Sequence, residues 1–175
     1  MKKFELTAES KINIFGKKLF RIKALISFGD VEEGETGGWI EKEENLEQSS
    51  GDAWVYGDAE VYGNARVSGN ARVYGNAEVY GNARVYGNAW VYGNARVSGN
   101  ADYTTIHGFG TQFRTTTFFQ CEDKQIRVSC GCFLGTIPEF REQVKNTREG
   151  KIAEEYLMIA DLMEKHFVKE KESGK

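Results

Sequence analysis

The sequence predicts a mainly β fold: a solenoid of stacked six-residue units, with a β-hairpin at its N-terminal end and strands followed by helices at its C-terminal end. Three observations predict this fold. A six-residue pattern runs through nine units from Gly51 to Thr104, glycine occurs 20 times while proline occurs once, and 13% of the residues are aromatic. Glycine without proline is not typical of collagen or of a disordered chain, and the aromatic residues supply surface for a core.

Each repeat unit contains a small and an apolar residue two positions apart. From Gly51 the chain reads GDAWVY, GDAEVY, GNARVS, GNARVY, GNAEVY, GNARVY, GNAWVY, GNARVS, GNADYT. In an extended A-x-V segment, Ala and Val point to one side and the variable residue points to the other. Gly accepts a positive φ and Asn tolerates a left-handed backbone, so the remaining residues form a corner. Stacking such units would bury a continuous core of Val and Ala.

The repeat resembles the hexapeptide repeat of left-handed parallel β-helices, in which an aliphatic residue is followed four places later by a small one, as in Val55 to Ala59 and Val61 to Ala65. In that family three units make a triangular coil of about 18 residues, so residues 18 apart lie about 4.8 Å above each other. The nine units therefore predict three coils. Leu46 precedes Val55 by nine residues and follows Ile40 by six, which predicts that the solenoid begins near Gly38 and has a three-residue insertion at one corner.

The outward-facing residues then fall into three columns. The aromatic column contains Trp54, Arg72 and Trp90 and is flanked by Tyr56, Tyr74 and Tyr92. The other two columns are charged: one contains Glu60, Glu78 and Arg96, and the other contains Arg66, Arg84 and Asp102. A guanidinium between two indoles is favourable cation–π geometry, at about 0.5–2 kcal/mol for each contact. The Asn residues from Asn64 to Asn100 predict a structural amide ladder.

Three interpretations of the aromatic column remain open. The column either stabilises the stack beneath a covering C-terminal segment, or forms the seam of a homo-oligomer (a dimer or a trimer), or binds a foreign partner or a planar ligand. Tyr, Trp and Arg are the residues enriched at interface hot spots. We therefore take Trp54, Tyr56, Arg72, Tyr74, Trp90 and Tyr92 as the candidate binding surface.

The flanking segments divide the chain into residues 1–36 as an N-terminal β cap, 37–104 as the solenoid, 105–135 as C-terminal strands and 136–175 as helices with a frayed tail, KEKESGK. Alternating apolar residues on both sides of Gly16 predict a hairpin, which would cover the open edge of the first coil. RTTTFFQ and KQIRVSCGCF predict two strands around a turn at 122–124. Thr136 with Glu139 forms a capping-box signature for a helix to about Lys145, and residues 151–168 show amphipathic helical spacing.

Several segments of the chain together also resemble a group of small phage and prophage hexapeptide-repeat proteins. The segments are FGKKLFRIKAL, GGWIE, the VYGNA array, NADYTTIHGFG, RTTTFF and VSCGCFLGTIPEFREQV. The final part, CGCF-G-T-x-x-E-F, is similar to a C-terminal module that follows other short-repeat arrays in phage proteins. The resemblance implies a viral origin and a location in the cytoplasm of an infected bacterium, but it names no chemistry.

Charge and hydropathy exclude some functions. The chain has 23 basic and 26 acidic residues, a formal charge of -3, so nucleic acid is not expected as a bulk electrostatic partner. No apolar run approaches the length that crosses a bilayer, and the N-terminus carries charges where a signal peptide has an apolar stretch. We expect a cytoplasmic protein without a membrane partner.

The sequence offers two weak candidates for chemistry. Hexapeptide-repeat acyltransferases use a histidine base, and His107, just beyond the last clean unit, is the residue that could serve as one. Cys121, Cys130 and Cys132 could bind zinc together with a histidine, but C-x-C lacks the C-x2-C spacing of common zinc knuckles, and alternation along a strand would put Cys130 and Cys132 on one face as small apolar residues. We expect no metal and no cofactor.

These observations favour a non-enzymatic, phage-encoded binding protein that inhibits a bacterial defence component, as anti-CRISPR and other anti-defence proteins do, through a rigid solenoid surface. Its partner would be a host defence effector or a signal nucleotide. The alternatives are an acyltransferase that uses His107 and a structural, virion-associated solenoid.

Overall fold

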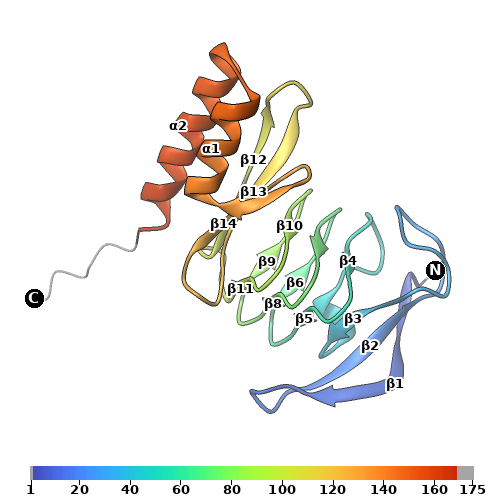
Figure 1. The fold of residues 1–175 in the computed structure, drawn as a ribbon. Coiled ribbons are helices and arrows are strands. Elements are labelled where there is room, and N and C mark those ends of the chain that lie inside the picture. The colour runs from blue at the N-terminus through green and yellow to red at the C-terminus, as the bar shows by residue number, and fades with distance from the viewer. Residues whose placement is uncertain (1, 169–175) are drawn as a thin grey trace, which may run out of the picture.

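A computed structural model describes residues 2–168 and shows a solenoid between two different end modules (Figure 1). The N-terminal hairpin lies at one end of the solenoid, and a four-stranded sheet with two helices lies at the other. The predicted mainly β solenoid fold with an N-terminal β region and C-terminal strands and helices is confirmed.

The solenoid is built from two-residue strands at a spacing of six residues. They are β4 (Trp54–Val55), β5 (Glu60–Val61), β6 (Arg66–Val67), β7 (Arg72–Val73), β8 (Glu78–Val79), β9 (Arg84–Val85), β10 (Trp90–Val91) and β11 (Arg96–Val97). Strands β4 to β8 each pair in parallel with the strand 18 residues further on, so that Val73 lies between Val55 and Val91. Three strands per coil and three columns of stacked residues follow from this register.

The predicted insertion at one corner is also present. Strand β3 (Thr36–Ile40) pairs in parallel with β5 through Ile40 and Val61, and Leu46 bridges to Val67, so both pairs are offset by 21 residues instead of 18. The short 3-10 helix η1 (Glu43–Asn45) turns the preceding corner. The Asn45 side chain is fully buried there and donates hydrogen bonds to the carbonyls of Gly63 (3.2 Å) and Ala65 (2.8 Å).

Inward-facing Val and Ala form the solenoid core and are at most 1% exposed from Ala53 to Val97. The corners rely on glycine: Gly69 has a φ of 68°, and a Cβ there would lie 3.0 Å from the backbone nitrogen of Gly87 in the next coil. The predicted amide ladder is confirmed for two pairs, since Asn64 donates to Asn82 (3.2 Å) and Asn70 donates to Asn88 (3.1 Å). The Asn100 side chain instead accepts a hydrogen bond from the backbone nitrogen of Arg84 at 2.9 Å.

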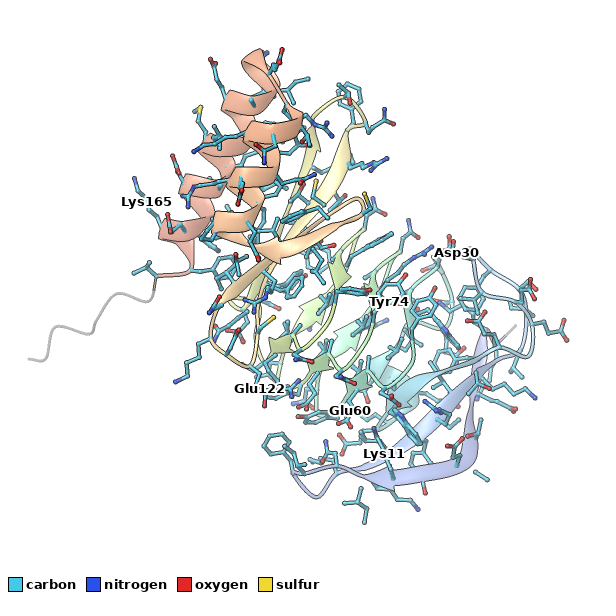
Figure 2. All side chains as sticks on the ribbon, in the orientation of Figure 1. Lys11, Asp30, Glu60, Tyr74, Glu122 and Lys165 are labelled. Carbon is cyan, nitrogen blue, oxygen red and sulfur yellow. The ribbon has the colours of Figure 1, made fainter. Side chains whose placement is uncertain are left out.

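The N-terminal hairpin covers the edge of the first coil. Strand β1 (Phe4–Ile12) pairs antiparallel with β2 (Lys18–Ala24), and β2 pairs antiparallel with β3. Strand β3 is also the first strand of the column that contains β5, β8 and β11. The hairpin therefore adds two strands, β2 and β1, beyond β3 at the end of this sheet. Figure 2 shows Lys11 beside Glu60, where the two side chains form an ion pair of 2.8 Å. This charged column is therefore partly neutralised by the cap.

The C-terminal strands form one antiparallel sheet of four instead of the two strands predicted. Its strands are β12 (Tyr103–Phe109), β13 (Arg114–Gln120), β14 (Ile126–Cys130) and β15 (Phe133–Thr136). Because the chain enters this sheet at Tyr103, the third column of the solenoid ends at Arg84. The prediction that Asp102 continues this column is wrong. The Asp102 carboxylate instead accepts backbone hydrogen bonds from Ser98 (2.9 Å) and Gly99 (3.1 Å), which end the solenoid in a turn.

Two consecutive phenylalanines join the C-terminal sheet to its neighbours. Phe119 is buried with the Val and Ala residues of the solenoid, whereas Phe118 is buried with the two helices, because successive side chains of a strand point to opposite faces. The helices α1 (Ile137–Thr147) and α2 (Gly150–His166) match the prediction. The capping box is confirmed, since the Glu139 backbone donates to the Thr136 hydroxyl at 3.3 Å. The predicted frayed tail lies outside the described residues.

Within residues 2–168, no helix combines the length and the apolar character needed to cross a membrane.

Candidate binding groove

The first residue of the aromatic column is enclosed by the chain itself. The Trp54 ring is fully buried and meets Phe4 and Phe28 edge-on, at centroid distances of 6.1 and 5.4 Å. A Cβ on Gly37 would lie 2.7 Å from this ring. Trp54 is therefore part of the junction with the N-terminal cap and, contrary to its place in the candidate binding surface, is not accessible to a partner in this structure.

The predicted sandwich of Arg72 between two indoles is half correct. The Arg72 guanidinium lies over Trp90, 5.5 Å from the ring centroid, but its charge is directed to Asp30 in the N-terminal segment, with one hydrogen bond of 2.6 Å and a second contact. Asp30 and Tyr74 lie on the same side of the solenoid (Figure 2). The hydrogen bond from Arg72 lowers the pKa of Asp30. Arg72 thus holds the N-terminal loop against the column.

The tyrosines beside the column are stacked on each other at first and become exposed toward the C-terminal end. Tyr56 and Tyr74 stack at 4.4 Å with nearly parallel rings (8°), and Tyr74 meets Tyr92 edge-on at 5.6 Å. Trp90 and Tyr92, in contrast, are 41% and 43% exposed. The accessible part of the candidate surface is therefore its C-terminal end.

This accessible end faces the C-terminal sheet across two cavities. The Trp90 backbone nitrogen donates to the hydroxyl of Thr117 in β13 at 3.0 Å, which fixes the sheet against the solenoid. Cavities of about 660 and 330 Å³ lie beside this contact and share four lining residues, Trp90, Ser129, Gly131 and Cys132. We call the two cavities together the groove. The remaining lining residues are Asn88, His107, Phe113, Arg114 and Thr115 in the larger cavity, and Tyr74, Tyr92, Phe133 and Leu134 in the smaller.

His107 lies in this groove, on β12. Its Nδ1 is 3.1 Å from the Thr115 hydroxyl, and the side chain is exposed. No Asp or Glu lines either cavity, so among residues 2–168 no carboxylate of the groove orients the imidazole. The structure therefore brings His107 together with Trp90, but without the acidic partner that commonly fixes a catalytic histidine.

The three cysteines are not brought together. Cys121 is buried where the C-terminal sheet meets the last coil, and its backbone forms an isolated antiparallel β-bridge with Ala95. The expectation that Cys130 and Cys132 share a strand face is wrong, because Gly131, with a φ of 61°, makes a turn that ends β14 at Cys130. Within residues 2–168 no three His, Cys, Asp or Glu side chains form a group that could hold a metal ion.

The different positions of the cysteines predict different reactivity. Burial raises the pKa of the Cys121 thiol to about 11, so roughly one such thiol in a thousand is ionised at pH 8. We expect a maleimide to modify exposed Cys132 first and Cys121 only after unfolding, as followed by mass spectrometry of the peptides. Labelling in guanidinium, where all three should react, is the control. Equal native rates for Cys121 and Cys132 would contradict the buried position of Cys121.

Phe113 and Arg114 are among the groove residues that the sequence analysis missed. Phe113 is the last residue of the turn between β12 and β13, and Arg114 is the first residue of β13. Phe113 adopts a positive φ of 48° and its side chain is 66% exposed. The glycines Gly108 and Gly110 just before them mark a turn. The signal in the sequence is this glycine-containing turn, which is followed directly by an aromatic residue and a basic residue.

Comparison with known proteins concerns the repeat alone. Residues 59–75, 65–78, 77–93 and 89–101 match the family model described as YdcK Beta solenoid repeat. A search of the curated proteins gave no match. Residues 59–101 are thus similar to a known repeat unit, and the chain contains repeats of a β-solenoid family.

Proposed function

We propose that the protein is a non-enzymatic, phage-encoded binding protein that inhibits a bacterial defence component, and that the groove is its recognition surface. The observation that carries the proposal is the pair of exposed rings, Trp90 and Tyr92, at the base of a groove whose opposite wall belongs to a different module. Large aromatic side chains in a concave site are typical of binding hot spots.

Contacts on two sides hold Trp90 in place, which favours binding. Trp90 extends from a parallel stack and is held from one side by Arg72, while its backbone is bonded to Thr117 of the opposite wall. Side chains that are already fixed lose little conformational entropy when a partner binds.

The resemblance to phage proteins supports a host target in the cytoplasm of an infected bacterium, either a defence effector or its signal nucleotide. A homo-oligomer, a dimer or a trimer, is part of the same proposal. Light scattering on the purified protein would give its mass.

We expect the double variant Trp90→Ala with Tyr92→Ala to lose protection of phages in a host strain whose defence system the wild-type protein blocks. Truncation of a hot-spot aromatic weakens binding by about tenfold or more. The measurement is the efficiency of plating over a panel of defence systems. Tyr86→Ala is the matched control, because Tyr86 is 62% exposed on another face of the solenoid. Full protection by the double variant would contradict the proposal.

A transferase is the second candidate, since His107 lines the largest cavity of the groove. Its free Nε2 could accept a proton from an acceptor hydroxyl or amine. Calorimetry with acetyl-CoA separates the two functions, because absence of binding at millimolar concentration would remove the transferase. If acetyl-CoA binds, a rate of acetyl transfer that is unchanged in His107→Ala would remove His107 as the base.

A further inference from the structure

Two long strands, β1 and β12, lie at the edges of their sheets in the part of the chain that the structure describes. The other edge strands there have two residues each, except β15, which has four and leads directly into α1. An edge strand presents backbone N–H and C=O groups on which another strand can pair. Only β1 and β12 are therefore long enough, within residues 2–168, for such pairing to extend over several residues.

Strand β1 carries the features by which edge strands avoid pairing. Residues 7–9 have no partner in β2, so an irregularity interrupts the strand. Glu5, Glu9 and Lys11 add charges along it. Bulges and charged side chains are the usual protection of an edge against further strands. The edge at β1 is therefore protected.

Strand β12 lacks this protection. It reads YTTIHGF and contains no Asp, Glu, Lys, Arg or Pro, in a chain of which 28% of the residues are charged. Residues 103–106 pair with β13 without interruption, and the register shifts only after Ile106. Tyr, Thr and Ile are also residues that favour strands. The edge at β12 is thus regular, uncharged and suited to accept another strand.

The hydrogen bonds of the sheet determine which residues of β12 face its free edge. The Asp102 carbonyl accepts from the Gln120 backbone nitrogen at 2.8 Å, so Asp102 faces β13. In an antiparallel pair, the backbone groups of successive residues point alternately toward the partner strand and away from it. Thr104 therefore faces β13 as well, whereas the N–H and C=O of Thr105 point to the free edge.

The next pair of strands gives the same direction. The Cys121 backbone nitrogen donates to the Gln125 carbonyl at 3.0 Å, so odd-numbered residues of β13 face β14 and even-numbered residues, such as Phe118, face β12. Phe118 is the residue that pairs with Thr104. Thr105 is exposed, and within residues 2–168 its backbone N–H and C=O have no hydrogen-bond partner. Both groups are therefore available to a strand from outside.

We propose that β12 pairs with β12 of a second copy of this chain, antiparallel and across a two-fold axis, so that two sheets of four strands join into one sheet of eight. This inference rests on the proposed function, of which a homo-oligomer is part, and it names the strand that joins the copies. With Thr105 at the axis, its N–H donates to the carbonyl of the same residue in the second copy, and its carbonyl accepts in return.

The side chains of β12 favour its own copy as the partner. Close to a two-fold axis each residue meets a residue of its own type, so a charged residue there would face a like charge, which is destabilising. β12 contains no Asp, Glu, Lys or Arg. Thr opposite Thr is, in contrast, one of the cross-strand pairs that stabilise an antiparallel sheet. The strand is therefore compatible with itself along the whole contact.

The test is size-exclusion chromatography with light scattering on the purified full chain over a range of concentrations. We expect the wild-type protein to have twice the mass of one chain. Thr105→Pro should weaken the dimer by about 10- to 100-fold, because it removes the outward N–H in both copies. Pairing with β13 uses Thr104 and Ile106, so it remains, and proline is tolerated on an edge strand. Thr105→Val is the matched control, because it keeps the N–H and should stay dimeric.

A second variant and a second measurement make the test independent of proline. Thr105→Lys keeps the backbone and places like charges at the axis, so it should also be monomeric. Circular dichroism should show that all three variants are folded. In hydrogen exchange of the wild-type protein, the Thr105 amide should exchange more slowly at high than at low concentration, whereas the Thr104 amide, which already faces β13, should not change.

A wild-type monomer at every concentration would overturn the inference, and so would a trimer, because antiparallel pairing of two edges closes with two copies. A dimer that persists in both Thr105→Pro and Thr105→Lys would place the contact elsewhere and reject β12. The plating assay separates this inference from recognition by the groove. A monomeric wild-type protein that protects phages would retain the groove and reject the dimer, whereas a dimer that depends on Thr105 but gives no protection would retain β12 and reject the inhibition of defence.

Discussion

Trp54→Ala should lower the free energy of unfolding by about 3–5 kcal/mol, the usual cost of removing a fully buried aromatic side chain. Trp54 fills the junction between the first coil and the N-terminal cap, where it contacts Phe4 and Phe28. Urea unfolding followed by circular dichroism measures the change. Limited proteolysis should also cleave the variant first near its N-terminus, because the hairpin loses the residue on which it packs.

Two other tryptophan variants are the controls. Trp90→Ala should cost less than about 1 kcal/mol, since Trp90 is 41% exposed. Trp54→Phe should cost less than Trp54→Ala, because it keeps most of the ring and removes an indole N–H that is buried without a hydrogen-bond partner among the described residues. Equal destabilisation by Trp54→Ala and Trp90→Ala would contradict the different roles that we assign to them.

Val73→Asp should prevent folding. Val73 is completely buried in the middle coil, between Val55 and Val91, and no basic side chain is among the residues of this core. Burial of an unpaired carboxylate costs several kcal/mol, comparable to the roughly 5–15 kcal/mol that stabilise a domain. Because each coil contacts only its neighbours, a defect in the middle coil separates the two ends of the stack.

Circular dichroism and size-exclusion chromatography of Val73→Asp measure the outcome. Val73→Thr is the matched control, since it keeps the shape and replaces one methyl group by a hydroxyl, and it should fold with a loss of about 1–3 kcal/mol. A folded Val73→Asp with the wild-type unfolding midpoint would show that residue 73 is not in the core.

The sequence predicted the solenoid in detail because its information is local and periodic. The spacing of Val and Ala determines which residues point inward, and the nine-residue step from Leu46 to Val55 indicates the insertion at one corner. The hairpin and the helices were predicted for the same reason, since glycine turns and capping boxes are local signals.

The site was not predictable to the same degree because it depends on long-range contacts. Trp54 and Trp90 occur in almost identical units, GDAWVY and GNAWVY. Trp54 is nevertheless buried by Phe4 and Phe28, which lie far earlier in the sequence, whereas Trp90 is exposed. The meeting of Trp90 with His107 and Arg114 depends on how the C-terminal sheet docks on the last coil. A single glycine, Gly131, decided the positions of Cys130 and Cys132.

The register of 18 residues per coil makes the solenoid a spacer whose length changes in discrete steps. Gain or loss of three units would move the C-terminal module along the axis by one strand spacing, about 4.8 Å, and would keep its orientation relative to the hairpin. Gain or loss of a single unit would rotate that module by a third of a turn and bring a charged column, in place of the aromatic one, under the C-terminal sheet. Variation in repeat number among related chains should therefore occur in threes wherever the groove is kept.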